Sequence, residues 1–317
     1  FKGRVLVVGD FYQLPPVQKS APDRQALFSF TYAFSSHAWS EFKFKNIELL
    51  ISKRTQDRKF YEILSRLRVG ELTQEVAGYV QNLRVPSAEL GGDTSVLFGR
   101  NYEADALNAR RLAALQTPLE TSRAEVKIYD ENLSERSLIN WINSLNAPEI
   151  LDMKIGAKII FTTNKWGEYY NGEQGKIAQI LKDGGEISSV IVQKDNGEII
   201  EVARNSFEMS EFIGSEGEIE QRATASFTQF PFKLAYALTI HKSQGMSINS
   251  LVCDLNNIFA NGQLYVALSR AISPERLKIL YNRGLDFRRY LEKVVKIDEE
   301  VRKFYADNVF ENIRENF

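Results

Sequence analysis

The chain has 317 residues, with 40 lysines and arginines against 41 aspartates and glutamates and a formal net charge of −1 at pH 7. This balance excludes a generally basic protein, so any contact with a polyanion must be confined to a local surface. A single cysteine and two histidines exclude an internal disulfide framework, argue against a metal cluster and indicate a reducing compartment. No apolar run reaches the length of a membrane span.

The first predicted element is a buried parallel strand over residues 4–8, where the apolar run is continuous. It leads into Gly9-Asp-Phe-Tyr-Gln-Leu-Pro-Pro-Val17, whose two prolines cannot continue a strand or a helix. Asp10 and Gln13 therefore follow the carboxyl end of a strand, where open α/β sheets bind ligands. Because the chain starts at Phe1 and enters a strand almost at once, we expect it to be part of a longer protein.

Helical patterns follow an aromatic segment over 21–45, which we interpret as a packed connector between domains. Apolar residues recur at helical spacing from Phe60 to Leu67, and Asp57 is the predicted N-cap, which places Arg54 at a strand-to-helix junction. Further predicted elements are a helix from Gly70 to about Asn82, a buried strand over 95–99 and a helix that starts near Asn101. Asn101 suits a phosphate contact and an ordinary helix cap equally well.

The pattern changes from about residue 115, and periodic helical character fades by about Asn146. From Lys154 onward, short strands alternate with turn signals. The tight-turn pairs are Asn171-Gly172, Gly184-Gly185 and Asn196-Gly197. They predict a small antiparallel β-barrel inserted into an α/β domain. One of its loops carries aromatic residues that could stack on bases or simply pack against the barrel: Trp166, Tyr169 and Tyr170.

A dense polar segment follows the apolar run at 234–238. Five of the six positions from 239 to 244 are polar: Thr239, His241, Lys242, Ser243 and Gln244. Because buried polar groups need partners, this segment predicts contact with a polyanionic ligand, and Gly245 then allows a backbone conformation that other residues avoid. A strand over 249–255, a helix over 262–271, a strand over 277–281 and terminal helices over 286–317 complete the chain. We expect Arg270 to project from the end of its helix toward a neighbouring domain.

Three of these blocks resemble motifs of Pif-type superfamily 1B DNA helicases, relatives of RecD and Dda. Residues 9–17 are similar to motif III, 239–245 to motif V and 262–271 to motif VI, in the family's order. The segment at Arg54 is similar to the family's Arg-Gln-x-Asp pattern, except that Thr55 replaces Gln. The resemblance covers residue 1 to about 285. It implies an α/β fold, namely a RecA-like P-loop-NTPase helicase lobe with an inserted SH3-like antiparallel β-barrel.

The resemblance also implies a division of the chain into five segments. These are the end of a first RecA-like lobe with motif III and the connector (1–45), the first part of a second lobe (46–150), the SH3-like insert (151–228), the return of the second lobe with motifs V and VI (229–285) and a C-terminal helical segment (286–317).

The family's ligands are ATP with Mg²⁺, single-stranded DNA and duplex junctions, and its movement is 5′ to 3′. By resemblance, Gln13 senses the γ-phosphate while Arg54 and Arg270 reach the nucleotide, Arg270 as an arginine finger. The implied nucleotide contacts are Asp10, Gln13, Arg54, Gln244, Gly245 and Arg270. The implied DNA contacts are Pro15, Asn101, Thr239, His241, Lys242 and Ser243.

The family's phosphate-binding loop and its magnesium-binding Asp-Glu pair are not found in these 317 residues. We expect both upstream of Phe1, and we therefore predict that this chain alone does not hydrolyse ATP. Two other hypotheses stay open: a non-catalytic module that binds single-stranded DNA, and a RecD-like subunit of an exonuclease complex. We expect a monomer without membrane association, in the cytoplasm of a bacterium or in the nucleus or mitochondrion of a eukaryote, acting in DNA repair or recombination.

Overall fold

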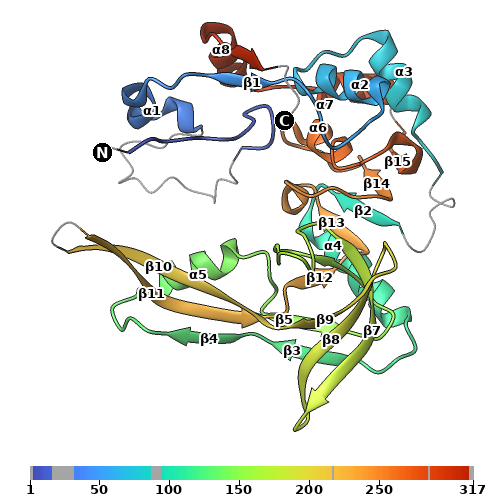
Figure 1. Ribbon diagram of the computed structural model, residues 1–317. Helices are drawn as coiled ribbons and strands as arrows, with labels where there is room; N and C mark the ends of the chain where they lie inside the picture. The colour runs from blue at the N-terminus through green and yellow to red at the C-terminus, as the bar shows by residue number, and fades with distance from the viewer. Residues whose placement is uncertain (1–2, 16–31, 87–93, 216–217, 285, 314–317) are drawn as a thin grey trace. The chain divides into compact units, whose positions relative to one another are not determined.

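The computed structural model describes residues 3–15, 32–86, 94–215, 218–284 and 286–313 (Figure 1). The chain divides into two compact units. Unit 1 comprises residues 1–90, 97–99 and 249–317, and unit 2 comprises residues 91–96 and 100–248. In the part of the chain described here, no helix combines the length and the apolar character needed to cross a membrane.

Two predicted helices of unit 1 are confirmed. Helix α2 (Arg58–Arg68) begins where the Asp57 carboxylate accepts a hydrogen bond from the Phe60 N–H at 2.7 Å, so Asp57 is the N-cap. Helix α3 (Gln74–Asn82) starts four residues later than predicted, because the Thr73 hydroxyl is its cap. Gly70 instead lies just beyond the end of α2, with a φ of +76° that suits glycine.

The core of unit 1 is α/β. Strands β14 (Leu251–Asp254) and β15 (Leu277–Leu280) pair in parallel and are almost entirely buried. A second parallel pair joins β1 (Ile47–Leu49) to β16 (Glu311–Ile313). The remaining elements of this unit are η1 (Ala33–Ser35), α1 (His37–Phe42), α6 (Gln263–Leu268), η4 (Pro274–Arg276), α7 (Phe287–Val294) and α8 (Glu299–Asp307).

Aromatic side chains link the first residues of unit 1 to helix α8. The Phe34 ring stacks on Phe304 with centroids 4.4 Å apart, and the Phe11 ring meets both rings edge-on. The described part of the aromatic segment therefore packs ring against ring. Residues 21–31 of that segment, and Pro16 in motif III, lie outside the described residues.

The predicted strand over residues 4–8 is wrong. These residues form no strand, and Leu6 and Val8 are 87% and 83% exposed. A buried strand needs neighbours for its backbone N–H and C=O groups and cover for its side chains. No strand in the described residues pairs with this run, so its apolar character alone does not produce a strand.

Unit 2 contains an antiparallel sheet of five strands in the order β12-β6-β7-β8-β9. Its predicted turns between strands are confirmed, because Gly185 and Gly197 have φ values of +90° and +91° at the β7–β8 and β8–β9 connections. The buried face is apolar, with Ile159, Phe161 and Val190 fully buried. The strand bounds are β6 (Lys158–Phe161), β7 (Gln174–Asp183), β8 (Glu186–Lys194), β9 (Ile199–Ala203) and β12 (Phe232–Leu234). An SH3-like form for this sheet stays a prediction.

The two longest strands of unit 2 were not predicted individually. Strands β10 (Asn205–Ser215) and β11 (Glu218–Gln229) form a long antiparallel pair, and β4 (Glu125–Ile128) pairs with β11 (Figure 1). The other elements are α4 (Asn101–Ala114), α5 (Glu135–Ser144), the antiparallel pair β3 (Glu120–Arg123) and β5 (Ile150–Met153), β13 (Ala237–Thr239) and η3 (His241–Ser243). Strand β2 (Ser95–Phe98) belongs to unit 2 in its first half and to unit 1 in its second.

Candidate functional site

Asp10 is held by an arginine that lies outside the predicted motifs. Arg68, the last residue of α2, donates from Nε to both carboxylate oxygens of Asp10, at 3.2 and 3.1 Å, and from Nη2 to Oδ1 at 3.0 Å. Its guanidinium also lies 4.7 Å from the centre of the Tyr12 ring. Burial acts to lower the pKa of Arg68, but the bond to Asp10 outweighs it and the net shift is upward.

Gln13 lies in the same turn. Its backbone N–H donates to the Asp10 carbonyl at 3.1 Å, and its side-chain amide is 3.5 Å from Asp10 Oδ2. The carbonyl of Tyr12 lies against Gly262, where a β-carbon would come within 2.7 Å of that oxygen. Gly262 also has a φ of +73°, so this position before α6 combines two requirements that only glycine meets. The turn that carries Gln13 therefore packs against Gly262, the residue before α6.

Arg54 and Arg270 converge on Ser269, at the end of α6. Arg54 donates from Nη1 to the Ser269 carbonyl at 2.7 Å, and Arg270 donates from Nη2 to the Ser269 hydroxyl at 2.9 Å. Burial, and then the charge of Arg54, lower the pKa of Arg270 to about 10. Burial likewise lowers the pKa of Arg54. Burial therefore disfavours the positive charge of both guanidiniums. A bound anion would favour that charge and raise the pKa of both side chains.

The expected orientation of Arg270 is wrong. Its side chain does not project from the helix but is 1% exposed, and its Nε donates to the Val266 carbonyl at 3.0 Å. Folding back satisfies the N–H groups of a residue whose charge would otherwise be costly to bury.

Tyr265 lies among these charged groups. It is on α6, and burial, followed by the charge of Asp10, raises the pKa of its hydroxyl, while Arg68, Arg270 and Arg54 act in the opposite direction. Four charged groups of unit 1 therefore influence the pKa of the Tyr265 hydroxyl. Tyr265 lies within motif VI but was not among the predicted site residues, and its position one helical turn before Ser269 is the signal that could have identified it.

In unit 2, residues 239–245 form a compact turn. The Lys242 N–H donates to the Thr239 hydroxyl at 3.4 Å, and the Ser243 hydroxyl donates to the Ile240 carbonyl at 2.8 Å. Ser243 is fully buried, so its hydroxyl supports the turn itself. Gly245 has a φ of +80° with no atom near its missing β-carbon, so the backbone angle requires glycine here. Burial lowers the pKa of His241.

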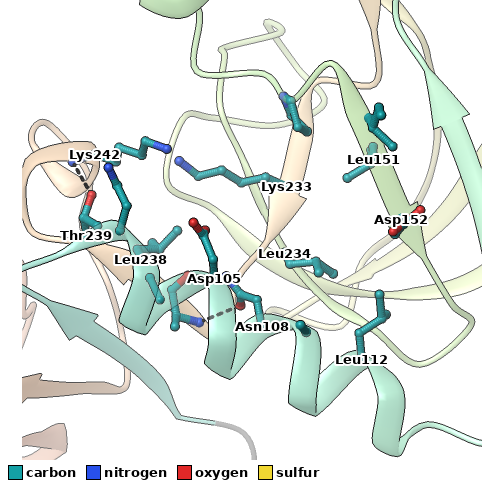
Figure 2. A pocket seen from close by; sticks show the side chains of 16 residues that line it. Asp105, Asn108, Leu112, Leu151, Asp152, Lys233, Leu234, Leu238, Thr239 and Lys242 are labelled. Carbon is teal, nitrogen blue, oxygen red and sulfur yellow. Dashed lines mark hydrogen bonds between the residues drawn. The ribbon is translucent and has the colours of Figure 1, made fainter.

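Next to this turn lies a pocket of about 410 Å³, formed within unit 2 (Figure 2). Of the predicted DNA contacts it brings together Asn101, Thr239 and Lys242. Asn101 is the first residue of α4 and not its cap, since Arg100 takes the cap position without a side-chain bond. His241 and Ser243 do not line the pocket, and Pro15 belongs to unit 1.

Comparison with known proteins gives a consistent result. A family model described as "Helicase" (Herpes_Helicase) matches residues 162–295. The "ATP-dependent DNA helicase Pif1" of Campylobacter jejuni is 46% identical over 315 residues, which are 98% of this chain and 70% of that protein.

Two solved structures resemble the fold. Pif1 of a Bacteroides species in complex with ADP-AlF4 has a TM-score of 0.75 at 24% identity, over 93% of this chain and 64% of that chain. Bacteroides Pif1 bound to single-stranded DNA has a TM-score of 0.63 at 24% identity, over 94% of this chain and 65% of that one. This chain thus spans less than two thirds of either solved chain. The likeness confirms the α/β, RecA-like fold class.

Proposed function

Because the chain belongs to the Pif1 family of ATP-dependent DNA helicases, we propose that it is the C-terminal part of an enzyme that moves 5′ to 3′ on single-stranded DNA and unwinds duplex. Unit 1 contributes groups that contact the ATP phosphates, and unit 2 contributes groups that contact DNA. ATP hydrolysis is then a property of the complete protein.

The convergence of Arg54 and Arg270 on Ser269 is the observation that carries the nucleotide assignment. Arg270 is buried and Arg54 is partly buried, and burial is the largest cause of the lowered pKa of each. A γ-phosphate would supply a negative charge beside the pair, and the pair would neutralise the negative charge that develops during phosphoryl transfer. Gln13, in the turn seated on Gly262, is proposed to report on the same phosphate.

Asp10 has a positioning role in this proposal. Its carboxylate already bonds to Arg68, so it orients the Gln13 turn, and we do not assign it a direct contact with nucleotide. Gln244 and Gly245 belong to unit 2, and their predicted approach to the nucleotide stays a prediction.

Magnesium accompanies ATP in this chemistry because it bridges the phosphate oxygens. No group of three or more His, Cys, Asp or Glu side chains that could hold a metal ion occurs among the residues that the structure describes. That magnesium binds together with the phosphate-binding loop stays a prediction from the resemblance.

The complete gene product is the material for the test. We expect ATP hydrolysis stimulated by single-stranded DNA, and unwinding of a duplex with a 5′ tail but not of one with a 3′ tail. Arg270→Lys should lower turnover by a factor on the order of 10³ while single-strand binding persists. Arg276→Lys, at an exposed position a few residues later, is the matched control and should leave turnover unchanged.

The alternatives give different results. A non-catalytic binding module would bind single-stranded DNA without turnover even as the complete product. A RecD-like subunit would need partner subunits and would support strand degradation. ATP turnover that survives Arg270→Lys would refute the role assigned to Arg270. ATP turnover by the 317-residue chain alone would refute the proposal that hydrolysis needs the complete protein.

A further inference from the structure

Lys233 is a charged residue inside an otherwise apolar run, and none of the motifs includes it. It lies on β12, where it pairs with Ile160 of β6 and follows the fully buried Phe232. Its side chain lines the pocket of unit 2 together with Thr239 and Lys242. A lysine costs free energy in such a place unless it has a partner of opposite charge.

The partner that Lys233 has in this structure is neutral. Its ammonium donates to the Asn146 side-chain oxygen at 2.6 Å. The second ammonium of the pocket belongs to Lys242, on the η3 turn, and the ends of the two side chains approach one another in Figure 2. Burial first, and Lys242 second, lower the pKa of Lys233 to about 7.

Carboxylates are present but do not neutralise this lysine. Asp105 on α4 and Asp152 on β5 line the same pocket, and neither forms an ion pair with Lys233 or Lys242 among the described residues. His241 precedes Lys242, and burial lowers its pKa below the usual value of 6.5. Asn101, Asn108 and Thr239 add neutral polar groups to the lining.

We propose that Lys233 and Lys242 together clamp one backbone phosphate of single-stranded DNA, and that Lys233 takes up a proton when the phosphate binds. The inference rests on the proposed DNA-binding function of unit 2. It adds Lys233 as a phosphate contact and the uptake of a proton by Lys233 on binding. Two ammonium groups that share a pocket repel each other when the pocket holds no anion, and a phosphodiester between them turns that repulsion into attraction.

The sign of the pH dependence follows from this. The pKa of Lys233 is near 7 in the free protein and higher in the complex, so binding takes up protons between these two values. The association constant is therefore highest at and below about pH 7 and falls as the pH rises toward the pKa of the complex. A permanently charged arginine at the same position would remove this dependence.

Titration calorimetry with an oligo-dT strand, at pH 7.5 and fixed salt, tests the proposal on the unmodified chain. Repeating the titration in HEPES and in Tris, whose ionisation enthalpies differ, reports the protons taken up. We expect between about 0.5 and 1 proton per complex from the wild-type chain and close to zero from Lys233→Arg. The wild-type association constant should fall roughly tenfold between pH 7 and pH 9, relative to Lys233→Arg.

Lys233→Met provides a second, independent result: at pH 7 it should bind oligo-dT at least about fivefold more weakly than wild type, because one ammonium contact is lost. Lys233→Arg should retain binding, which separates loss of charge from loss of fold. Equal proton uptake by wild type and Lys233→Arg, or undiminished binding by Lys233→Met, would overturn the inference while the DNA-binding function stands. If the wild-type chain fails to bind oligo-dT at all, the proposed function of unit 2 is refuted, and this inference with it.

Discussion

Arg68 and Asp10 form a fork-shaped ion pair between residues 58 positions apart in the sequence. Their side chains are 24% and 17% exposed, and the guanidinium also faces the rings of Tyr12 and Tyr305, which stack with centroids 4.3 Å apart. The pair fixes the turn that carries Gln13 to the end of α2.

Arg68→Ala should therefore destabilise unit 1. We expect the free energy of unfolding to fall by about 2–3 kcal/mol, because the substitution leaves a half-buried carboxylate without its partner. Urea denaturation followed by tyrosine fluorescence measures the change. Arg66→Ala is the matched control, since Arg66 pairs with Glu75 on a more exposed surface, and it should cost less than about 1 kcal/mol. Equal losses from both variants would contradict a special role for Arg68.

Gly262→Ala should be more costly than glycine substitution at an ordinary turn. The new methyl group would lie 2.7 Å from the Tyr12 carbonyl oxygen, in addition to the strain of a φ of +73°. Gly185→Ala isolates the strain, because Gly185 has a φ of +90° with nothing near its missing β-carbon. We expect about 1 kcal/mol for Gly185→Ala and at least about 2–3 kcal/mol for Gly262→Ala, measured by thermal denaturation. A Gly262→Ala variant no less stable than Gly185→Ala would show that the close approach is not maintained in solution.

Lys233→Met should stabilise the folded chain near neutral pH while it weakens DNA binding. The folded-state pKa of about 7 lies below the usual 10.5, so the unfolded wild type binds more protons than the folded protein between these values. Wild-type stability consequently rises with pH from about 7 to about 10, whereas the methionine variant lacks this dependence. We expect the variant to be more stable by on the order of 1–3 kcal/mol at pH 7, with the advantage shrinking as pH rises. Melting temperatures at pH 7 and pH 9 check both statements, and a constant difference would contradict the lowered pKa.

Asn101 and His241 are predicted to contact DNA. Substituting both by alanine should weaken binding of a fluorescent single strand by roughly tenfold, measured by anisotropy at fixed salt. Asn143→Ala, at an exposed position on α5 away from the pocket, is the control and should bind as the wild type does. Unchanged affinity of the double variant would refute the placement of these two residues on the strand.

The sequence alone determined those features of the fold that depend only on residues close together in the chain. The Asp57 cap, the helical spacing from Phe60 to Leu67 and the glycines at 185 and 197 each act through neighbours a few residues away. The three helicase motifs likewise identified the family, because each is a contiguous block. None of these features depends on how distant segments meet.

Tertiary structure decided the remaining features. Residues 4–8 have the composition of a strand but no partner, and a strand exists only by pairing. Arg270 was expected to project, yet the end of its own helix offers acceptors that allow it to be buried. Asp10 bonds to Arg68, and Lys233 shares a pocket with Lys242, only because the fold brings these residues together. Burial and neighbouring charge set the protonation of such groups, and both are properties of the folded chain.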